Sequence, residues 1–122
     1  MPKDARQLTT WYLADLLAMK VYEATRPFPH NEMYGLISQM RRASIPVPAN
    51  ITEGAARRSQ REFLQFLYIA SSSLSELGYY IHLSSRLGYL TENEPLKTLH
   101  KETARTLQGL INKIEADLTR RS

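Results

Sequence analysis

Five arginines between residues 41 and 61 are the side chains whose type and spacing best fit a chemical role: Arg41, Arg42, Arg57, Arg58 and Arg61. Glu53 is the only acidic residue in this segment, so the segment carries +4, which equals the formal net charge of the whole chain. A guanidinium presents a planar fork of N–H donors that fits the oxygens of a phosphate. The cluster therefore predicts binding to nucleic acid or another polyanion. The alternative is that these arginines form ion pairs between subunits with Glu53, Glu62 or Glu76.

No other combination of residues supports catalysis or metal binding. The three histidines lie far apart in the sequence, at His30, His82 and His100, and they lack the spacing of metal ligands. There is no cysteine, and the five glycines form no phosphate-binding loop. The serines have no recognisable base beside them. We therefore expect a protein that is not an enzyme, with no catalytic residue, no metal, no cofactor and no small-molecule substrate.

Length and composition indicate one domain that stays inside the cell. A chain of 122 residues can bury a single core, and 43% of these residues are hydrophobic. The N-terminal residues lack the apolar stretch of a signal peptide, and no run reaches the roughly 18 apolar residues of a membrane span. The absence of cysteine suits a reducing compartment. We expect residues 1–122 to form one cytoplasmic domain without a membrane partner.

Hydrophobic residues recur at helical spacing and predict an all-α fold, an antiparallel up-down four-helix bundle with helices at about 5–25, 30–57, 59–87 and 92–120. Residues that stop or cap helices support these helix boundaries. Two prolines in "RPFP" stop the first helix, Ser59 and Glu62 form a capping box, and Gly88 stands where a C-terminal glycine belongs. The last helix is predicted to start either with Thr91 as cap and Glu94 three residues later, or with Pro95 in its first turn.

The second helix contains Pro46 and Pro48, yet its apolar residues keep helical phase across both. A loop has no reason to preserve this phase, so we predict one helix kinked at the prolines, although each costs roughly 3 kcal/mol in a helix interior. The residues that keep phase are Met33, Leu36, Ile37, Met40, Ser44, Val47, Ile51 and Gly54. Asn50 is placed to donate to carbonyl groups that the kink leaves free, and Glu53 is placed to pair with Arg42 or Arg57. These polar residues, Arg42, Asn50, Glu53 and Arg57, share one side of the helix, and that side also suits a ligand site.

Two helices carry more apolar surface than one bundle can bury. The first is apolar around most of its circumference, and the third has a second stripe made of Ile69, Tyr80, Leu83 and Leu87. Because a helix in a four-helix bundle buries one face, this stripe predicts an interface between subunits.

Several stretches together resemble a known bacterial family: "YGLISQMRRA", "IPVPANITEG", "RRSQREFLQFLYIASSSLSEL" and "LGYL", preceded by Trp11, Tyr22, Phe28, Pro29 and Glu32. The family comprises small four-helix-bundle proteins encoded within intervening sequences of 23S ribosomal RNA genes, also called the ribosomal protein S23 family. The resemblance covers about residues 10–115. Its motif falls here on Arg42, Pro48, Asn50, Glu53 and Gly54, whereas Pro46 replaces a residue that is commonly small.

The resemblance implies an up-down bundle similar to the accessory proteins of diversity-generating retroelements. Those proteins assemble as rings of five and bind nucleic acid through a basic surface. Together, the residues and the resemblance predict a homo-oligomer, with a pentamer favoured, that binds nucleic acid, and structured RNA in particular, through the arginine cluster. The alternative is a protein-interaction scaffold whose arginines serve contacts between subunits.

Overall fold

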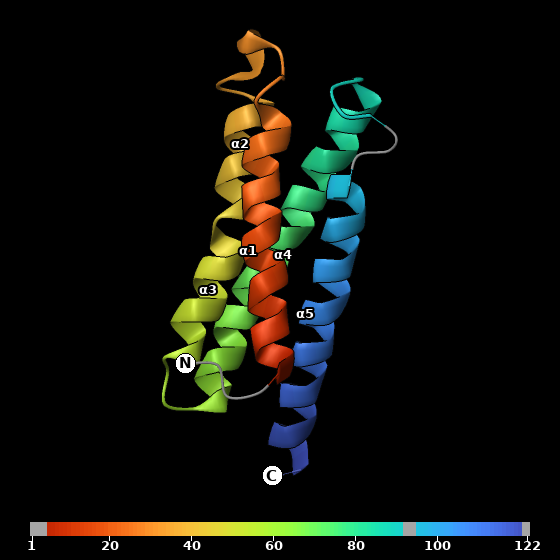
Figure 1. The fold of residues 1–122 in the computed structure, drawn as a ribbon. Helices are drawn as coiled ribbons and strands as arrows, with labels where there is room; N and C mark the ends of the chain where they lie inside the picture. The colour runs from red at the N-terminus through yellow and green to blue at the C-terminus, as the bar shows by residue number, and fades with distance from the viewer. Residues whose placement is uncertain (1–4, 92–94, 121–122) are drawn as a thin grey trace.

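A computed structural model of the protein describes residues 5–91 and 95–120 (Figure 1). Its elements are α1 (Ala5–Thr25), the short 3-10 helix η1 (His30–Glu32), α2 (Leu36–Ser44), α3 (Pro46–Ala55), α4 (Gln60–Arg86) and α5 (Pro95–Arg120). Within the described residues there is no strand. Because α2 and α3 join into one kinked helix, the molecule is a four-helix bundle, and the predicted fold class is confirmed.

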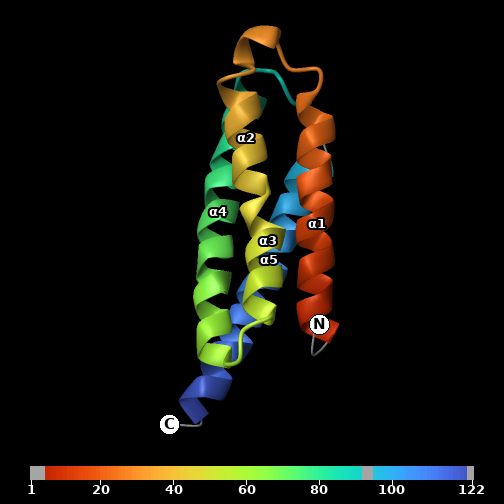
Figure 2. The same cartoon turned by 90° about the vertical axis from the view of Figure 1, so that its left-hand side faces the viewer.

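The helices stand at the corners of a square in chain order. α1 packs against α2, α3 and α5, and α4 packs against the same three helices from the opposite corner. α1 and α4 therefore lie on a diagonal, with α1 in front of α4 in Figure 1, and Figure 2 shows the same bundle from the side of α2 and α3. The connections after α1 and after α4 lie at one end of the bundle, and the α3–α4 turn lies at the other.

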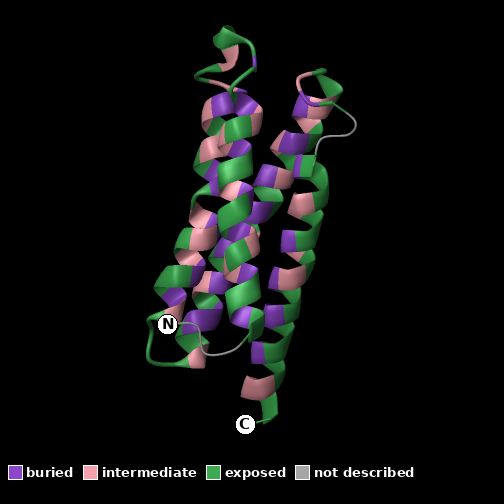
Figure 3. Cartoon of the chain, in the orientation of Figure 1, coloured by how far each residue is buried: buried purple, intermediate pink, exposed green. Residues whose placement is uncertain are grey.

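The core runs along the inner faces of all these helices, as the buried residues in Figure 3 show. Met40, Val47 and Ile51 are each at most 1% exposed, so the inner face of α2 continues onto α3 as its apolar phase predicted. Met33 is the exception at 43% exposed, because it lies before α2 begins. No helix in the described part of the chain combines the length and the apolar character that crossing a bilayer requires.

The kink is a continuous helical turn rather than a loop. Ile45 keeps helical dihedral angles, φ −62° and ψ −43°. Its N–H donates to the Arg41 carbonyl at 3.3 Å, and its own carbonyl accepts from the Ala49 N–H at 3.2 Å. Since a proline has no N–H, Pro46 and Pro48 leave the carbonyls of Arg42 and Ser44 without their usual donors. The prolines thus remove two hydrogen bonds but do not change the register.

The second helix begins later than predicted. The sequence indicated a start at residue 30, whereas residues 30–32 form η1 and α2 begins at Leu36. Gly35 has φ −110° and ψ −115°, which lies outside helical geometry, so the helix cannot extend backward through it. Glu32 then reaches the new helix start, where its Oε1 accepts from the Leu36 N–H at 3.2 Å. A Cβ at Gly35 would lie 2.5 Å from that oxygen, so a larger residue there would displace the Glu32 side chain from the start of α2.

The other predicted helix signals are found where the structure describes them. The Ser59 hydroxyl accepts from the Glu62 N–H at 3.1 Å and caps α4. Gly88 has φ +81°, the left-handed conformation that glycine adopts at low cost, and the Tyr89 N–H returns to the Ser84 carbonyl at 2.9 Å. The predicted start of the last helix at residue 92, including Glu94, lies outside the described residues.

Gly54 allows α3 and α4 to approach closely. A Cβ at this position would lie 2.7 Å from both the Phe63 ring and the Phe66 Cβ. Phe63 is only 3% exposed, so its ring has little room to move away. The glycine is therefore required by packing against α4, and not by a special backbone conformation, since Gly88 alone among the described glycines has a positive φ.

We predict that Gly54→Ala destabilises the protein by about 1–3 kcal/mol, the usual cost of overpacking a core. Gly109→Ala is the matched control, because Gly109 lies in α5 and a Cβ there would have no neighbouring side chain within 4 Å. This control should be stabilising by about 0.4–1 kcal/mol through the unfolded state. Urea unfolding of the two variants and the wild type measures both effects. Equal stability of the two variants would contradict the close packing at Gly54.

Candidate functional site

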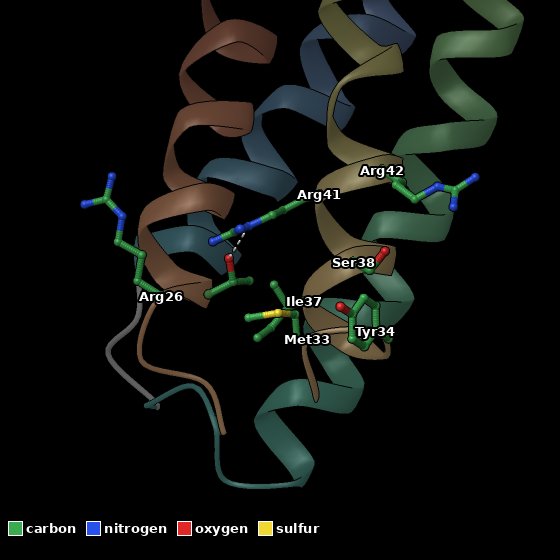
Figure 4. Close-up of a pocket in the computed structure, with 8 residues that line it drawn as sticks. Arg26, Met33, Tyr34, Ile37, Ser38, Arg41 and Arg42 are labelled. Atoms are coloured by element: carbon green, nitrogen blue, oxygen red, sulfur yellow. Dashed lines mark hydrogen bonds between the residues drawn. The ribbon is translucent and has the colours of Figure 1, made fainter. Parts of the chain in front are cut away.

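A surface pocket lies between the C-terminal end of α1 and the beginning of α2 (Figure 4). Its volume is about 460 Å³, within the range of small-ligand pockets. Three of its eight lining residues are arginines and none is acidic; the eight are Thr25, Arg26, Met33, Tyr34, Ile37, Ser38, Arg41 and Arg42. Ser38 and Arg42 are four residues apart in α2 and therefore lie on one face at successive turns, and Tyr34, which precedes the helix, lies on the same side of the pocket in Figure 4. We call this the arginine pocket.

Arg41 lies across the middle of the arginine pocket and is held at both sides of its guanidinium. Its Nε donates to the Thr25 hydroxyl at 3.0 Å, and its Nη2 donates to the Tyr22 carbonyl at 3.3 Å. The guanidinium carbon also lies 4.6 Å from the centre of the Tyr22 ring. The Tyr22 carbonyl is one of the last in α1, where carbonyls lack helical donors and the helix dipole favours a positive charge. Arg41 therefore caps α1 from the neighbouring helix.

Arg26 and Arg42 extend outward on opposite sides of the arginine pocket in Figure 4. Both are exposed, and neither forms an ion pair within the described residues. The nearby Glu32 carboxylate is already engaged, since its Oε2 accepts from the Tyr89 hydroxyl at 3.0 Å. That hydrogen bond is the main reason why the pKa of Tyr89 is raised above its usual value. The pocket thus keeps a positive charge that no carboxylate in its lining neutralises.

The remaining three arginines of the predicted cluster lie at the opposite end of the bundle. Arg57 and Arg58 follow α3, and Arg61 is in the first turn of α4. Thirteen helical steps lead from Arg42 to the end of α3 at Ala55, which at 1.5 Å per residue is about 20 Å. The five arginines that are close in sequence therefore form two separate sets, because the helix between them is continuous. We call the second set the turn arginines.

Arg57 is the least available of the turn arginines, because it is paired within the chain. Its Nη2 lies 3.0 Å from the Glu53 Oε1, and its guanidinium carbon lies 4.7 Å from the centre of the Phe66 ring. This pairing within α3 is the one that the spacing of Glu53 and Arg57 allowed. Arg58 and Arg61 are exposed and form no ion pair among the described residues.

Of the eight residues that line the arginine pocket, Arg41 and Arg42 were predicted from the sequence as site residues, and the additions include Arg26 and Tyr34. Arg26 lies outside the cluster in sequence, and the return of the chain at residues 26–35 brings it to the side of α2. No sequence signal placed Tyr34 in the pocket, because it precedes α2 and the non-helical Gly35 separates it from the helical spacing of Ser38 and Arg42.

Most residues of the family motif make contacts within the bundle itself. Asn50 Nδ2 donates to the Pro46 carbonyl at 2.8 Å. This bond lies at the kink, as predicted, but its acceptor is not one of the two carbonyls that lose a donor to proline. Glu53 pairs with Arg57, and Gly54 packs against α4. Pro48 lies in the first turn of α3, while Arg42 belongs to the arginine pocket.

The predicted subunit interface on α4 is only partly exposed. Ile69 and Leu87 are 49% and 50% exposed, whereas Tyr80 and Leu83 are partly buried against the core. α1 carries a more exposed apolar row, with Leu8, Tyr12, Leu16 and Met19 between 40% and 59% exposed. The excess apolar surface that the sequence indicated is therefore present, and α1 carries four of the exposed residues.

No metal site is recognisable in the described part of the chain, where no three His, Cys, Asp or Glu side chains converge. His82 and His100 line a shallow pocket with Lys97, but His100 Nε2 lies 2.7 Å from the Leu74 carbonyl and so has a partner within the bundle.

Comparisons with known proteins agree with the resemblance noted above. The family model for the 23S rRNA-intervening sequence protein matches residues 6–113. A crystal structure of a protein with unknown function from the S23 ribosomal protein family of Bacteroides thetaiotaomicron is similar, with a TM-score of 0.79. The similarity covers 88% of this chain and 98% of that one at 20% sequence identity, so it supports the fold alone. No curated protein sequence matches this chain.

We predict that Arg41→Ala destabilises the fold by about 1–3 kcal/mol, since it leaves the end of α1 without its cationic cap. Arg42→Ala is the matched control, because the neighbouring side chain is exposed and should change stability by at most about 0.5 kcal/mol. Arg41→Lys should lie between them, as an ammonium keeps the charge but loses the fork. Urea unfolding measures all three, and equal losses for Arg41→Ala and Arg42→Ala would refute the capping role.

Proposed function

The chain belongs to the 23S rRNA-intervening sequence protein family, and from that starting point we propose that it is a non-enzymatic, oligomeric helical bundle that binds structured RNA through arginine contacts to phosphate groups. The observation that carries the proposal is the arginine pocket. Three guanidinium groups, two from α2 and one from the turn after α1, line one concave surface, and no carboxylate is part of that lining. Arg26 and Arg42 form no ion pair among the described residues, so their charge stays available to a ligand.

The chemistry of the site suits phosphate. Arg41 is held in place and, with two of its five N–H groups engaged within the described residues, retains others for a ligand. Arg26 and Arg42 are exposed cations at either side, where a phosphate backbone passing over the pocket would meet them. Such contacts position a strand but read no sequence, so binding should depend strongly on salt and weakly on base sequence.

Assembly of several copies would multiply these contacts. The exposed row of Leu8, Tyr12, Leu16 and Met19 on α1 forms a continuous apolar face, and Ile69 and Leu87 on α4 add to the apolar surface. We propose that a second copy of the chain covers the α1 row, in the homo-oligomer for which the family resemblance implied five copies. Each copy would then present one arginine pocket to the same RNA, and the linked sites would bind more tightly than one site alone.

The first functional prediction concerns charge. Arg26→Gln with Arg42→Gln should weaken RNA binding and reduce the slope of log affinity against log salt by about 0.7 for each phosphate of a single strand that the variant no longer neutralises. Lys101→Gln with Arg105→Gln removes the same charge from the exposed side of α5 and should have a smaller effect. Fluorescence anisotropy with labelled RNA at several salt concentrations measures both slopes.

Two different results would contradict the proposal. Absence of RNA binding by the wild type at low salt would refute the RNA-binding function. Loss of the oligomer in the Arg26 and Arg42 variant would show that these arginines hold subunits together, as the scaffold alternative holds. Arg58→Gln with Arg61→Gln, tested in parallel, shows whether the turn arginines contribute to the same binding.

The second functional prediction concerns assembly. Tyr12→Glu with Met19→Glu should yield smaller species of unchanged helicity, because both side chains are more than half exposed and contribute little to the core. Thr98→Glu with Asn112→Glu adds the same charge at exposed positions of α5 and should leave the mass unchanged. Size-exclusion chromatography with light scattering gives the masses. A wild-type mass equal to the 14.0 kDa of one chain would refute the oligomer.

A further inference from the structure

Tyr34 is the most exposed large hydrophobic residue in the described part of the chain, at 92%, and it lies at the edge of the arginine pocket. Its ring contributes little to the core, because almost none of its surface is removed from water. It lies two residues before the first residue of α2, and Figure 4 shows it on the same side of the pocket as Ser38 and Arg42 of that helix. An exposed aromatic face is thus held next to exposed cations.

The backbone that carries Tyr34 is fixed from both sides. The Met33 N–H donates to the His30 carbonyl at 3.1 Å, and the Gly35 N–H donates to the Glu32 carbonyl at 3.0 Å. Glu32 in turn bonds to the start of α2 and to the Tyr89 hydroxyl. The ring is therefore presented by a hydrogen-bonded turn, which reduces the conformational freedom that a ligand would have to remove on binding.

The rest of the pocket is suited to one nucleotide. Met33, which is 43% exposed, and Ile37 supply apolar surface between Tyr34 and the held guanidinium of Arg41. A nucleotide has a flat apolar base at one end and a phosphate at the other, and the pocket offers a partner for each. A base within a duplex already stacks on its neighbours on both faces, so only an unpaired base can place its face on a side chain.

We propose that the arginine pocket binds one unpaired nucleotide of RNA, with its base stacked on Tyr34, its phosphate held by Arg41, and the phosphates on either side of it contacted by Arg26 and Arg42. The inference rests on the proposed RNA binding and adds to it a preference for single-stranded segments, such as the loop of a hairpin. The arginines supply affinity for any strand, and Tyr34 distinguishes unpaired from paired nucleotides.

The test compares a single-stranded RNA with a duplex of the same sequence, using the full-length protein. Tyr34→Ala should weaken binding of the single strand by about 5- to 150-fold, which corresponds to the loss of one base stack. It should change duplex binding by less than about 2-fold and leave the salt slope unaltered, because the tyrosine ring carries no charge. Tyr34→Phe keeps the aromatic face and should bind like the wild type.

Tyr79→Ala is the matched control, since Tyr79 is an exposed tyrosine of α4, at 59%, that does not line the arginine pocket. It should leave both affinities unchanged. A second measurement uses a single-stranded RNA that contains 2-aminopurine, whose fluorescence is quenched by stacking. The quench should appear with the wild type and Tyr34→Phe and be absent with Tyr34→Ala.

Three results would overturn the inference. If Tyr34→Ala binds single strands as well as the wild type does, the base does not stack on Tyr34, although RNA binding through phosphates stands. If adenosine monophosphate displaces the RNA at concentrations similar to that of the RNA itself, the pocket is a site for free nucleotides. If the wild type binds neither RNA at low salt, the inference fails together with the proposed function.

Discussion

At Ile45 the backbone keeps helical dihedral angles even though a proline follows, and the arrangement of the whole bundle depends on that residue. A turn of any other geometry would rotate α3 relative to α2 and move Val47 and Ile51 off the face that Met40 occupies. Instead one inner face runs from Leu36 to Gly54 and packs against α4 along both halves. The burial of this continuous face compensates for the hydrogen bonds that the two prolines remove.

The same continuity explains why the positive charge is divided between two ends of the molecule. A loop would allow arginines that are close in sequence to share one surface. The continuous helical path through α2 and α3 instead keeps the two sets at opposite ends of the bundle. The structure also gives them different roles. Arg41 caps α1, Arg57 pairs with Glu53, and Arg26 and Arg42 remain open to solvent beside the arginine pocket. A shared residue type within a short segment therefore did not imply a shared site.

Local patterns were sufficient to predict the helices, the cap at Ser59, the glycine at residue 88 and the continuous phase of the kinked helix, because each depends on interactions within a few residues. They were insufficient for the beginning of α2, which depends on the backbone of Gly35 and on Glu32 reaching Leu36. Arg26 could not be assigned to the pocket from sequence, since its proximity to α2 arises from the path of the connection. The sequence also predicted that Asn50 would donate to a carbonyl at the kink, but it did not predict that this would be the carbonyl of Pro46.

The two connections at the pocket end of the bundle are tied to each other. The Tyr89 hydroxyl donates to Glu32, and the Tyr89 ring lies 5.2 Å from that of Phe28, which is only 6% exposed. Tyr89 is positioned by the left-handed turn at Gly88 that ends α4. Local opening of the segment after α4 therefore frees the segment that carries Tyr34, and the two segments become ordered or disordered as one cooperative unit. A ligand that binds beside Tyr34 consequently stabilises residues more than fifty positions away in the chain.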